Sequence, residues 1–422
     1  MSRDHLHGAV LCVLFLFAAT CGADEFHYNN ILIGDRASGM GGAYTAISDD
    51  PSGMYYNPAG IAYSIGKNLS ASVNAYNVSK RTYKGVIGGQ DWTRTSSTLL
   101  PNFFGIIQPV GKVKLGFSYA VPDSNQEDQD QSFKYSFDNW GSTTHVINFN
   151  NNNTTNLFGP SAALQLSDTF SVGTTLYVHL RNTEAIFNST KQSDDKKYHE
   201  WVNEYRESDE FGIKPIIGVM WTPVDKLSLG AAVSKTVILK SEVLQQSNSS
   251  TALNQSFDNT NGPVVLDRNN ESLATSAHKR TYPYQVTAGA AYFANSSLLI
   301  SGDLSYFSAY DFRWIDGVAK RRAVINGAIG TEYFLNKNWA LRGGLFTDFA
   351  NTPAVMEGVT DQLEHIDMFG GSMSLSHFTK NTSISFGGNY KAGSGKSQIF
   401  GENIQNATAS NWSVFVSSSY SY

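Results

Sequence analysis

The sequence predicts an all-β fold: an antiparallel transmembrane β-barrel of about 14 strands with an N-terminal hatch inside its lumen. Three observations lead to this prediction. Polar and apolar residues alternate along most of the 422-residue chain, short and long links between strands alternate, and a glycine-rich segment precedes the first strand. Beyond the N-terminus no apolar run approaches the roughly 18 residues of a transmembrane helix, which excludes a helical membrane protein.

Residues 1–23 are expected to be a signal peptide. Arg3 precedes an apolar run of 12 residues, 9–20, which is too short for a transmembrane helix. The Cys-Gly-Ala sequence at 21–23 has the small residues of a cleavage site. A lipoprotein signal that ends at Cys21 is an alternative, which the bulky threonine before it disfavours. Cleavage after residue 23 would remove both cysteines, so the exported chain would contain no disulfide.

Residues 24–67 are expected to form the hatch, on the periplasmic side of the barrel. Their most distinctive part is GDRASGMGGAYTAISDDPSGMYYNPAGIA, residues 34–62, which contains six glycines. A chain threaded through a barrel brings its backbone close to inward side chains, and glycine permits that approach. Asn57 can hydrogen-bond to the local backbone and Pro58 restricts the turn.

The candidate gating residues of this hatch are Asn57, Pro58, Ala59 and Gly60. Ala59 and Gly60 are expected to leave room for a neighbouring strand. The alternative role for this turn is to anchor the hatch during folding.

Two other functions of this segment are disfavoured. The glycines at 39–42 superficially suggest a phosphate-binding loop, but no Gly-Lys-Ser/Thr sequence follows them. Asp49 and Asp50 are candidates either for metal binding or for salt bridges to inward arginines. Salt bridges are the better explanation, because two neighbouring acids lack a convergent ligand set. We therefore predict neither a cofactor nor a metal site.

The barrel is expected to span residues 68–422, and the strand around residues 166–182 illustrates why. Its apolar face carries Phe170, Val172, Leu176, Val178 and Leu180. Its other face carries Ser171, Gly173, Thr175, His179 and Arg181. Successive side chains of a strand point to opposite faces, so one face of this strand is apolar and the other is wet.

The same alternation predicts about 14 strands, and the links between them differ in length. The predicted strands are 68–79, 98–109, 112–121, 155–167, 169–186, 205–223, 226–241, 278–294, 296–311, 321–336, 338–350, 364–378, 381–394 and 410–422. The long links are 80–97, 122–154, 187–204, 242–277, 312–320, 351–363 and 395–409. Long loops at one end, tight turns at the other and an even strand number are typical of a transmembrane barrel, not of a sandwich.

The last strand and the aromatic residues support a barrel. The chain ends on Tyr422, and a final strand with a terminal aromatic residue resembles the signal read by the bacterial barrel-assembly machinery. Trp221, Tyr284, Tyr292 and Trp339 lie near strand ends, as expected for girdles at the two membrane interfaces.

The segment 34–62 resembles the N-terminal hatch of the FadL/TodX family of outer-membrane long-chain fatty acid and hydrocarbon transporters. Members share the glycine-rich segment, the paired acids before a Tyr-Tyr-Asn-Pro-Ala-Gly turn, and a barrel of fourteen strands. The similarity continues at 212–235, GIKPIIGVMWTPVDKLSLGAAVSK, and at 282–306, YPYQVTAGAAYFANSSLLISGDLSY. It therefore covers most of the chain.

This resemblance implies passive uptake of a hydrophobic molecule, such as a long-chain fatty acid, across the bacterial outer membrane. An outer loop would capture the ligand, the hatch would move, and the ligand would leave sideways into the bilayer. The implied partners are the hydrophobic ligand, outer-membrane lipid and lipopolysaccharide, and the barrel-assembly machinery. A monomer is expected.

The spacing of residues in one loop and the family resemblance together suggest candidate ligand residues. In KKYHEWVNEYRES, residues 196–208, Trp201, Val202 and Tyr205 have a helix-compatible spacing. The loop 187–204 follows the fifth strand, where the family places part of its outer ligand groove. Arg342 is predicted to face the lumen, where it could bind a ligand carboxylate or pair with another charge across the barrel.

Other functions remain as alternatives. The chain could be a non-transporting scaffold or shuttle barrel of the same family, or a general porin. An enzyme is not expected, because no Gly-x-Ser-x-Gly motif is present. A net charge of −5 gives no sign of a nucleic-acid partner.

Overall fold

The computed structural model describes residues 26–136, 141–253, 264–275, 279–314, 317–360, 362–399 and 403–421. The expected signal peptide and both cysteines lie outside these ranges, as does the expected start of the hatch at residue 24.

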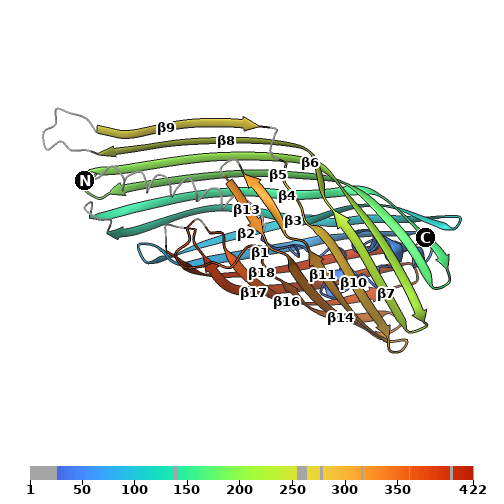
Figure 1. Ribbon diagram of the computed structural model, residues 1–422. Coiled ribbons are helices and arrows are strands. Elements are labelled where there is room, and N and C mark those ends of the chain that lie inside the picture. Colours follow the sequence, from blue (N-terminus) through green and yellow to red (C-terminus); the bar gives the residue numbers. More distant parts are fainter. Residues whose placement is uncertain are drawn as a thin grey trace.

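Within the described residues, fourteen antiparallel strands form a closed ring (Figure 1). They are β1 (Asn68–Ile87), β2 (Gln90–Val110), β3 (Val113–Ser136), β4 (Ser142–Ser167), β5 (Phe170–Ser193), β6 (Tyr198–Val224), β7 (Leu227–Lys235), β10 (Tyr284–Phe293), β11 (Leu298–Phe307), β14 (Val324–Asn336), β15 (Trp339–Asp348), β16 (His365–Phe378), β17 (Thr382–Ser397) and β18 (Gln405–Ser421). Since β18 pairs with β1, the ring is closed, and the predicted barrel and its strand number are confirmed.

Two more strands widen the sheet beyond the ring. β8 (Val237–Leu253) continues β7 and pairs with residues 198–213 of β6, and β9 (Val264–Thr275) pairs with β8. A separate hairpin is formed by β12 (Tyr310–Trp314) and β13 (Gly317–Arg321).

The polarity of the strands is the reverse of that in a soluble protein. In β5 the polar face, with Ser171, Thr175, His179 and Arg181, is buried, whereas Leu176 on the apolar face is exposed. The outward positions of the other strands are likewise rich in exposed large apolar residues. The polar face therefore lines the lumen and the apolar face contacts lipid.

Several predicted loops are in fact strands. β1 to β6 are 20 to 27 residues long, about twice the 9–11 residues needed to cross a bilayer. The segments predicted as loops 80–97, 122–154 and 187–204 are mostly extensions of these strands, and β8 and β9 occupy much of 242–277. The prediction failed because outward side chains beyond the membrane face water, so the outer face of these extensions lacks the apolar residues that mark a membrane strand.

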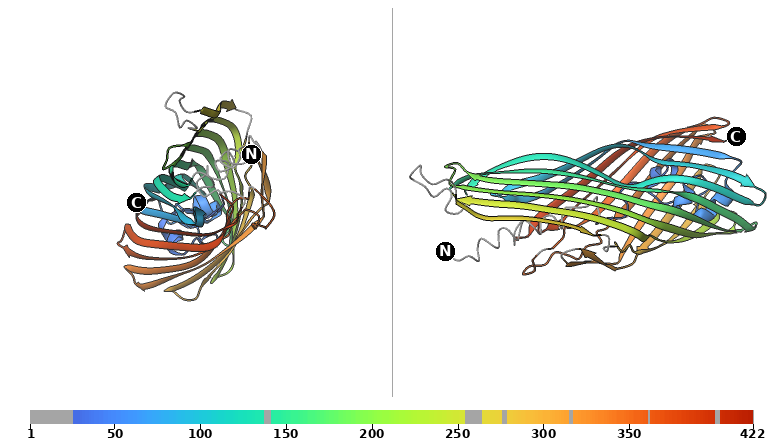
Figure 2. Two further views of the ribbon diagram at one scale, coloured as in Figure 1. Left: turned by 90° about the vertical axis from the view of Figure 1, so that its left-hand side faces the viewer. Right: turned by 90° about the horizontal axis from the view of Figure 1, so that it is seen from above.

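The strand extensions project from one end of the barrel (Figures 1 and 2). Their inner face has an apolar core of its own, to which Tyr83, Trp92, Phe149 and Phe187 contribute. We call these residues the outer aromatic cluster. It lies on the side of the molecule that we assign to the cell exterior, because the short turns mark the periplasmic end.

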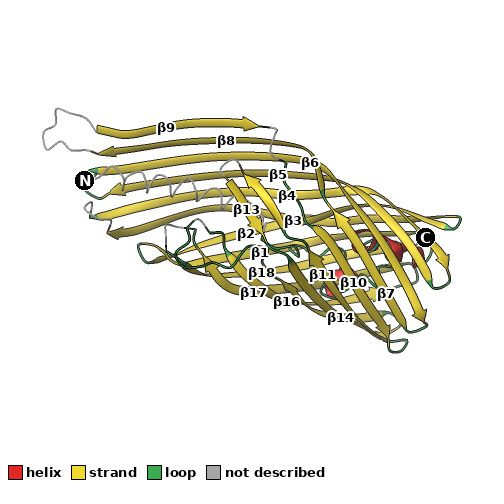
Figure 3. Ribbon diagram, in the orientation of Figure 1, coloured by secondary structure: helices red, strands yellow, loops and turns green. Residues whose placement is uncertain are grey.

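The hatch lies inside the ring, in the half nearer the short turns (Figures 2 and 3). It contains the short helices α2 (Asp35–Gly39) and α3 (Gly53–Tyr56) and the 3-10 helix η1 (Pro58–Tyr63). None of the described helices is long and apolar enough to cross a membrane.

The predicted aromatic girdle residues Trp221, Tyr284, Tyr292 and Trp339 are all exposed on the outer surface of the ring. The outward positions of β18, including Trp412 and Val416, are exposed as well.

We expect Phe386→Arg to lower the free energy of unfolding in a bilayer by about 2–4 kcal/mol, because Phe386 is exposed on the apolar face of β17. Ser296→Arg, in the exposed turn after β10, is the matched control and should cost about 1 kcal/mol or less. Urea titration of both variants in liposomes measures the difference. Equal losses would contradict the assignment of this face to lipid.

Candidate functional site

The hatch approaches the wall most closely where two neighbouring strands carry glycines opposite each other. These cross-strand pairs are Gly173–Gly218, Gly230–Gly289 and Gly330–Gly344. In each pair, a Cβ atom on at least one glycine would overlap with the hatch backbone: Pro58 at the first pair, Thr45 at the second and Met40 at the third. We call the pairs glycine sockets, because only glycine leaves room there for the hatch.

Asn57 occupies the first socket. Its side-chain amide donates to the carbonyl oxygens of Thr45 at 2.8 Å and of Val219 in β6 at 3.0 Å. Its Oδ1 accepts from the N–H of Ala59 at 3.1 Å, which caps η1 at the start of that helix. Asn57 is fully buried and joins the hatch to the wall.

The rest of the predicted gating turn is also buried inside the barrel. The carbonyl oxygen of Ala59 accepts from the Ser171 hydroxyl of β5 at 2.9 Å, so Ala59 lies against a strand as expected. Gly60 does not: a Cβ on Gly60 would overlap with Ser48, which belongs to the hatch. The gating role of the turn stays a prediction.

Two buried carboxylates of the wall bind backbone N–H groups of the hatch. Asp303 in β11 accepts from residues 44 and 45 at 2.9 and 2.8 Å. Asp348 in β15 accepts from residues 28 and 29 at 3.2 and 3.1 Å and pairs with Lys391 in β17 at 2.6 Å. These strands therefore fix the hatch at two points that are 16 residues apart in its chain.

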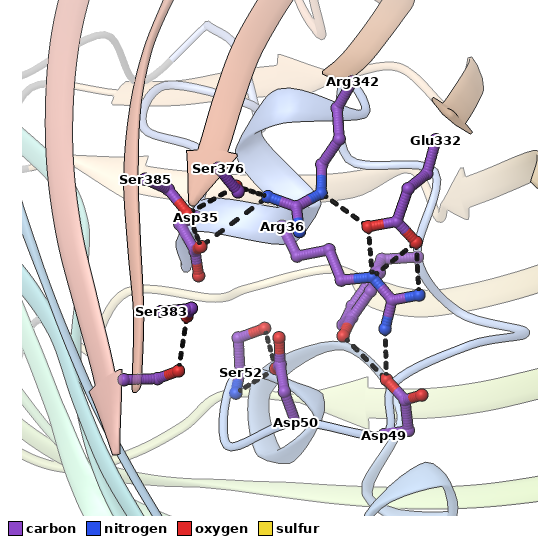
Figure 4. Close-up of polar contacts among 12 residues, drawn as sticks. Asp35, Arg36, Asp49, Asp50, Ser52, Glu332, Arg342, Ser376, Ser383 and Ser385 are labelled. Carbon is purple, nitrogen blue, oxygen red and sulfur yellow. Dashed lines mark hydrogen bonds and ion pairs between the residues drawn. The ribbon is translucent and has the colours of Figure 1, made fainter. Parts of the chain in front are cut away.

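A third wall carboxylate binds the hatch through arginines (Figure 4). Glu332 in β14 pairs with Arg36 of α2 at 2.6 Å and with Arg342 of β15 at 2.7 Å. Arg36 also contacts Asp49 at 2.6 Å, and Arg342 lies 3.8 Å from Asp35. Burial alone would lower the pKa of the Arg36 guanidinium, but the carboxylates of Asp49 and Glu332 raise it, so Arg36 stays charged.

The paired acids of the hatch thus have structural partners. Asp50 accepts from the N–H of Ser52 at 2.8 Å and from its hydroxyl at 2.6 Å (Figure 4). Burial, and then the nearby charge of Asp35, raise the pKa of Asp50 to about 6. Among the described residues, no group of three or more His, Cys, Asp or Glu side chains is arranged to hold a metal ion.

The predicted capture residues lie in a strand, and the helix-like spacing is wrong. Trp201, Val202 and Tyr205 belong to the outer part of β6. Val202 is buried and packs in the outer aromatic cluster, whereas Trp201 and Tyr205 are on the opposite, more exposed face. The structure therefore separates residues that the sequence grouped together.

Arg342 faces the lumen, as predicted, and is buried. Its guanidinium binds Glu332 and also donates to the Ser376 hydroxyl at 2.5 Å. A ligand carboxylate would have to replace one of these partners. Its contact with a ligand stays a prediction.

A cavity of about 220 Å³ lies between the first residues of the hatch and the wall. Residues that line it include Tyr28, His179, Arg181, Lys214, Arg280 and Tyr282. The alternation placed His179 and Arg181 together on the polar face of one strand, but it did not predict the other four residues as parts of the same site. Tyr282 lies in the quoted 282–306 segment, whereas nothing in the local sequence marks Tyr28 or Lys214.

The ladder between β2 and β3 is interrupted beside this cavity. It runs from Val110–Val113 to the pair Phe103–Ala120, and beyond that point these described strands share only the single pair Ser96–Glu127. We call the interval, residues 97–102 opposite 121–126, the β2–β3 gap. At its edge Pro122 lines the cavity, and its carbonyl accepts from the N–H of Ile31 in the hatch at 3.1 Å. Where the hatch contacts the wall at Pro122, β2 and β3 are therefore not joined to each other by ladder hydrogen bonds.

Comparison with known proteins gives one family. A family model described as outer membrane protein transport protein (OMPP1/FadL/TodX) matches residues 16–392. Among solved structures, a FadL homologue from Pseudomonas aeruginosa is 13% identical with a TM-score of 0.64, over 93% of this chain and 99% of that chain.

Two toluene transporters have similar structures. TbuX from Ralstonia pickettii is 16% identical and TodX from P. putida 12% identical, each with a TM-score of 0.59 over 94% of this chain and 99% of that chain. At these identities the likeness shows a shared fold. A search of curated proteins found no match.

We expect Gly344→Ala to displace the hatch and raise ion conductance in planar bilayers several-fold, because the new methyl group would overlap with the backbone at Met40. Gly343→Ala is the matched control, since the nearest atom to its Cβ would lie at 3.9 Å. Heat-modifiable migration on a gel establishes that both barrels fold. If the two variants conduct equally, the third glycine socket does not position the hatch.

Proposed function

The chain belongs to the OMPP1/FadL/TodX family of outer-membrane transport proteins, and from this premise we propose that it takes up long-chain fatty acids by passive transport. Family membership and the closed barrel indicate a transporter of hydrophobic molecules in the bacterial outer membrane. The fatty-acid ligand, its capture, the hatch movement and the lateral release are our proposal.

The observation that carries the mechanism is the position of the cavity. It lies between the hatch and the wall, and Ile31, Pro122 and Asp123 at the β2–β3 gap contribute to its lining. A ligand in this cavity touches the hatch on one side and a wall without ladder bonds on the other. Release through the gap would deliver an apolar molecule into lipid, whereas exit toward the periplasm would leave it in water.

The polar groups of the cavity favour a ligand with a carboxylate. Arg181 and Arg280 both pair with Glu210, at 3.6 and 3.3 Å. The Lys214 amine lies 5.1 Å from the centre of the Tyr55 ring, and within the described residues it forms no ion pair with a carboxylate. We therefore assign the ligand carboxylate to Lys214 in preference to Arg342, which already binds Glu332.

The outer part of the barrel supplies the entrance. The outer aromatic cluster lies above the hatch, and Val202 packs against it. We propose that the ligand's tail first contacts this apolar surface and that Trp201 and Tyr205, on the other face of β6, contribute through lipopolysaccharide or lipid contacts. The ligand then displaces hatch bonds and enters the cavity.

Three alternatives have specific expectations. Aromatic hydrocarbons are the alternative ligands, because two of the similar structures are described as toluene transporters. A general porin would conduct ions freely, which the buried hatch opposes. A scaffold or shuttle barrel would transport neither class of ligand.

We expect Lys214→Met to lower oleate uptake into liposomes about tenfold, because a hydrogen bond to a charged group contributes about 1.5 kcal/mol. Toluene uptake should not change. Lys240→Met, which removes an exposed lysine paired with Glu242, is the matched control. Radiolabelled oleate and toluene measure both uptakes. Equal loss of the two ligands would contradict the carboxylate site, and no uptake of either by the unmodified protein would contradict transport itself.

We expect Asn57→Ala to leave the barrel folded but to change oleate uptake at least threefold, because it removes the bonds to Thr45, Val219 and Ala59. Asn295→Ala is the control, since it removes a similar cap from the exposed turn after β10. Heat-modifiable migration reports folding. Loss of folding and uptake together would leave only the anchoring role, and normal folding with normal uptake would exclude Asn57 from the gate.

A further inference from the structure

The ladder between β14 and β15 ends before the strands do. Its last pair is Ala328–Phe346, although β14 begins at Val324 and β15 continues to Asp348. We call the segment beyond this pair, residues 326–327 opposite 347–349, the β14–β15 gap. It lies on the other side of the lumen cavity from the β2–β3 gap, since Asn326 and Gly327 line that cavity too.

Side chains replace the ladder in this gap. The N–H of Gly327 donates to the Thr347 hydroxyl at 2.9 Å, and the N–H of Phe349 donates to Oδ1 of Asn326 at 2.9 Å. The Thr347 hydroxyl also donates to the same Oδ1 at 3.3 Å. Backbone polar groups in a membrane must be satisfied within the protein, and here two side chains do so. Side-chain bonds can be exchanged by rotation about χ1, whereas ladder bonds require the strands to separate.

The hatch holds one edge of the gap. The Asn29 side-chain amide donates to the Thr347 carbonyl oxygen at 3.1 Å. The Asn29 N–H binds Asp348 at 3.1 Å, and its carbonyl accepts from Lys391 at 3.0 Å. A movement of Asn29 would therefore release three contacts of β15 and β17 together.

An apolar groove of about 820 Å³ lies outside the wall at the same place. Its lining includes the outward-facing Ala288, Gly302, Leu304, Ile329, Leu345 and Phe369. The groove and the lumen cavity share Asp303, Gly327 and Ala328 in their linings. The residues shared by the two spaces are therefore two small ones and one carboxylate, and the buried Phe346 lines the groove beside them.

We propose that the β14–β15 gap is a second lateral portal, through which the acyl chain of the transported ligand passes from the lumen cavity into the outer groove when Asn29 releases Thr347. This inference rests on the proposed function. The acyl chain is the occupant because the groove is apolar and shares three lining residues with the cavity in which we place the fatty-acid carboxylate. The ligand carboxylate stays bound to Lys214 until the acyl chain has entered the lipid.

The first test measures the gap without transport. Amide hydrogen exchange of the protein in lipid nanodiscs, read by mass spectrometry on peptides that cover residues 325–328, reports its opening. Asn29→Ala should raise this exchange at least fivefold. Ser385→Ala, which removes a hatch contact to Asp35 away from the gap, is the matched control and should leave it unchanged. No rise in Asn29→Ala overturns the coupling of the hatch to the portal.

The second test seals the portal. Gly327→Cys/Thr347→Cys places a disulfide across the gap on the outer face, where a Cβ on Gly327 meets only Leu304, at 3.6 Å, and Asp303 at 4.0 Å. Oxidation should lower oleate uptake into liposomes at least threefold, and reduction should restore it. Thr331→Cys/Gly343→Cys is the matched control, because these residues pair in the intact ladder of the same strands.

The outcomes separate the two proposals. Full uptake by the oxidised Gly327→Cys/Thr347→Cys protein overturns the portal and leaves release to the β2–β3 gap. Absence of oleate uptake in the unmodified protein overturns the proposed function. The hydrogen-exchange measurement then still tests whether Asn29 controls opening of the β14–β15 gap. Loss of uptake in both disulfide variants would show a general effect of cross-linking and would also overturn the portal.

Discussion

The interaction on which the structure depends is the binding of hatch backbone N–H groups by buried carboxylates of the wall. A ring of fourteen strands encloses a lumen that its own side chains do not fill. A segment folded inside it must satisfy its backbone polar groups without bulk water. The short helices of the hatch meet only part of this need. Asp303 and Asp348 supply the missing acceptors, so the strands that carry them determine where the hatch lies.

This mode of attachment suits a plug that has to move. A typical hydrogen bond contributes only about 0.5–1.5 kcal/mol net, so a few can be exchanged for contacts with a ligand. The glycine sockets add shape, because the strand residues at these points carry no side chain and the hatch can approach the wall closely. The pairing of buried Glu332 with Arg36 and Arg342 fixes the position of the hatch relative to the wall. Removing one partner of a buried ion pair is costly, so positions of the hatch in which Glu332 has lost Arg36 are disfavoured.

Much of this arrangement could be predicted from sequence, and the failures have physical reasons. Alternation identified the barrel because lipid on one face and the lumen on the other impose opposite polarity. It failed for the outer extensions, where water lies outside, and so Val202 was grouped with Trp201 although strand geometry separates them. The hatch turn at Asn57 was recognisable because its chemistry is local. Lys214, Tyr28 and the two wall gaps were not, since each depends on contacts between residues that are distant in the chain.

The central claim, that a ligand exchanges the bonds between wall carboxylates and hatch backbone, is tested most directly by hydrogen exchange at those amides. The protein in lipid nanodiscs would be measured with and without saturating oleate, on peptides that cover residues 40–48. The account predicts that oleate accelerates exchange at Tyr44 and Thr45, which Asp303 binds, while amides in the β4–β5 ladder exchange at an unchanged rate. Bound oleate with unchanged exchange at both hatch amides would contradict it.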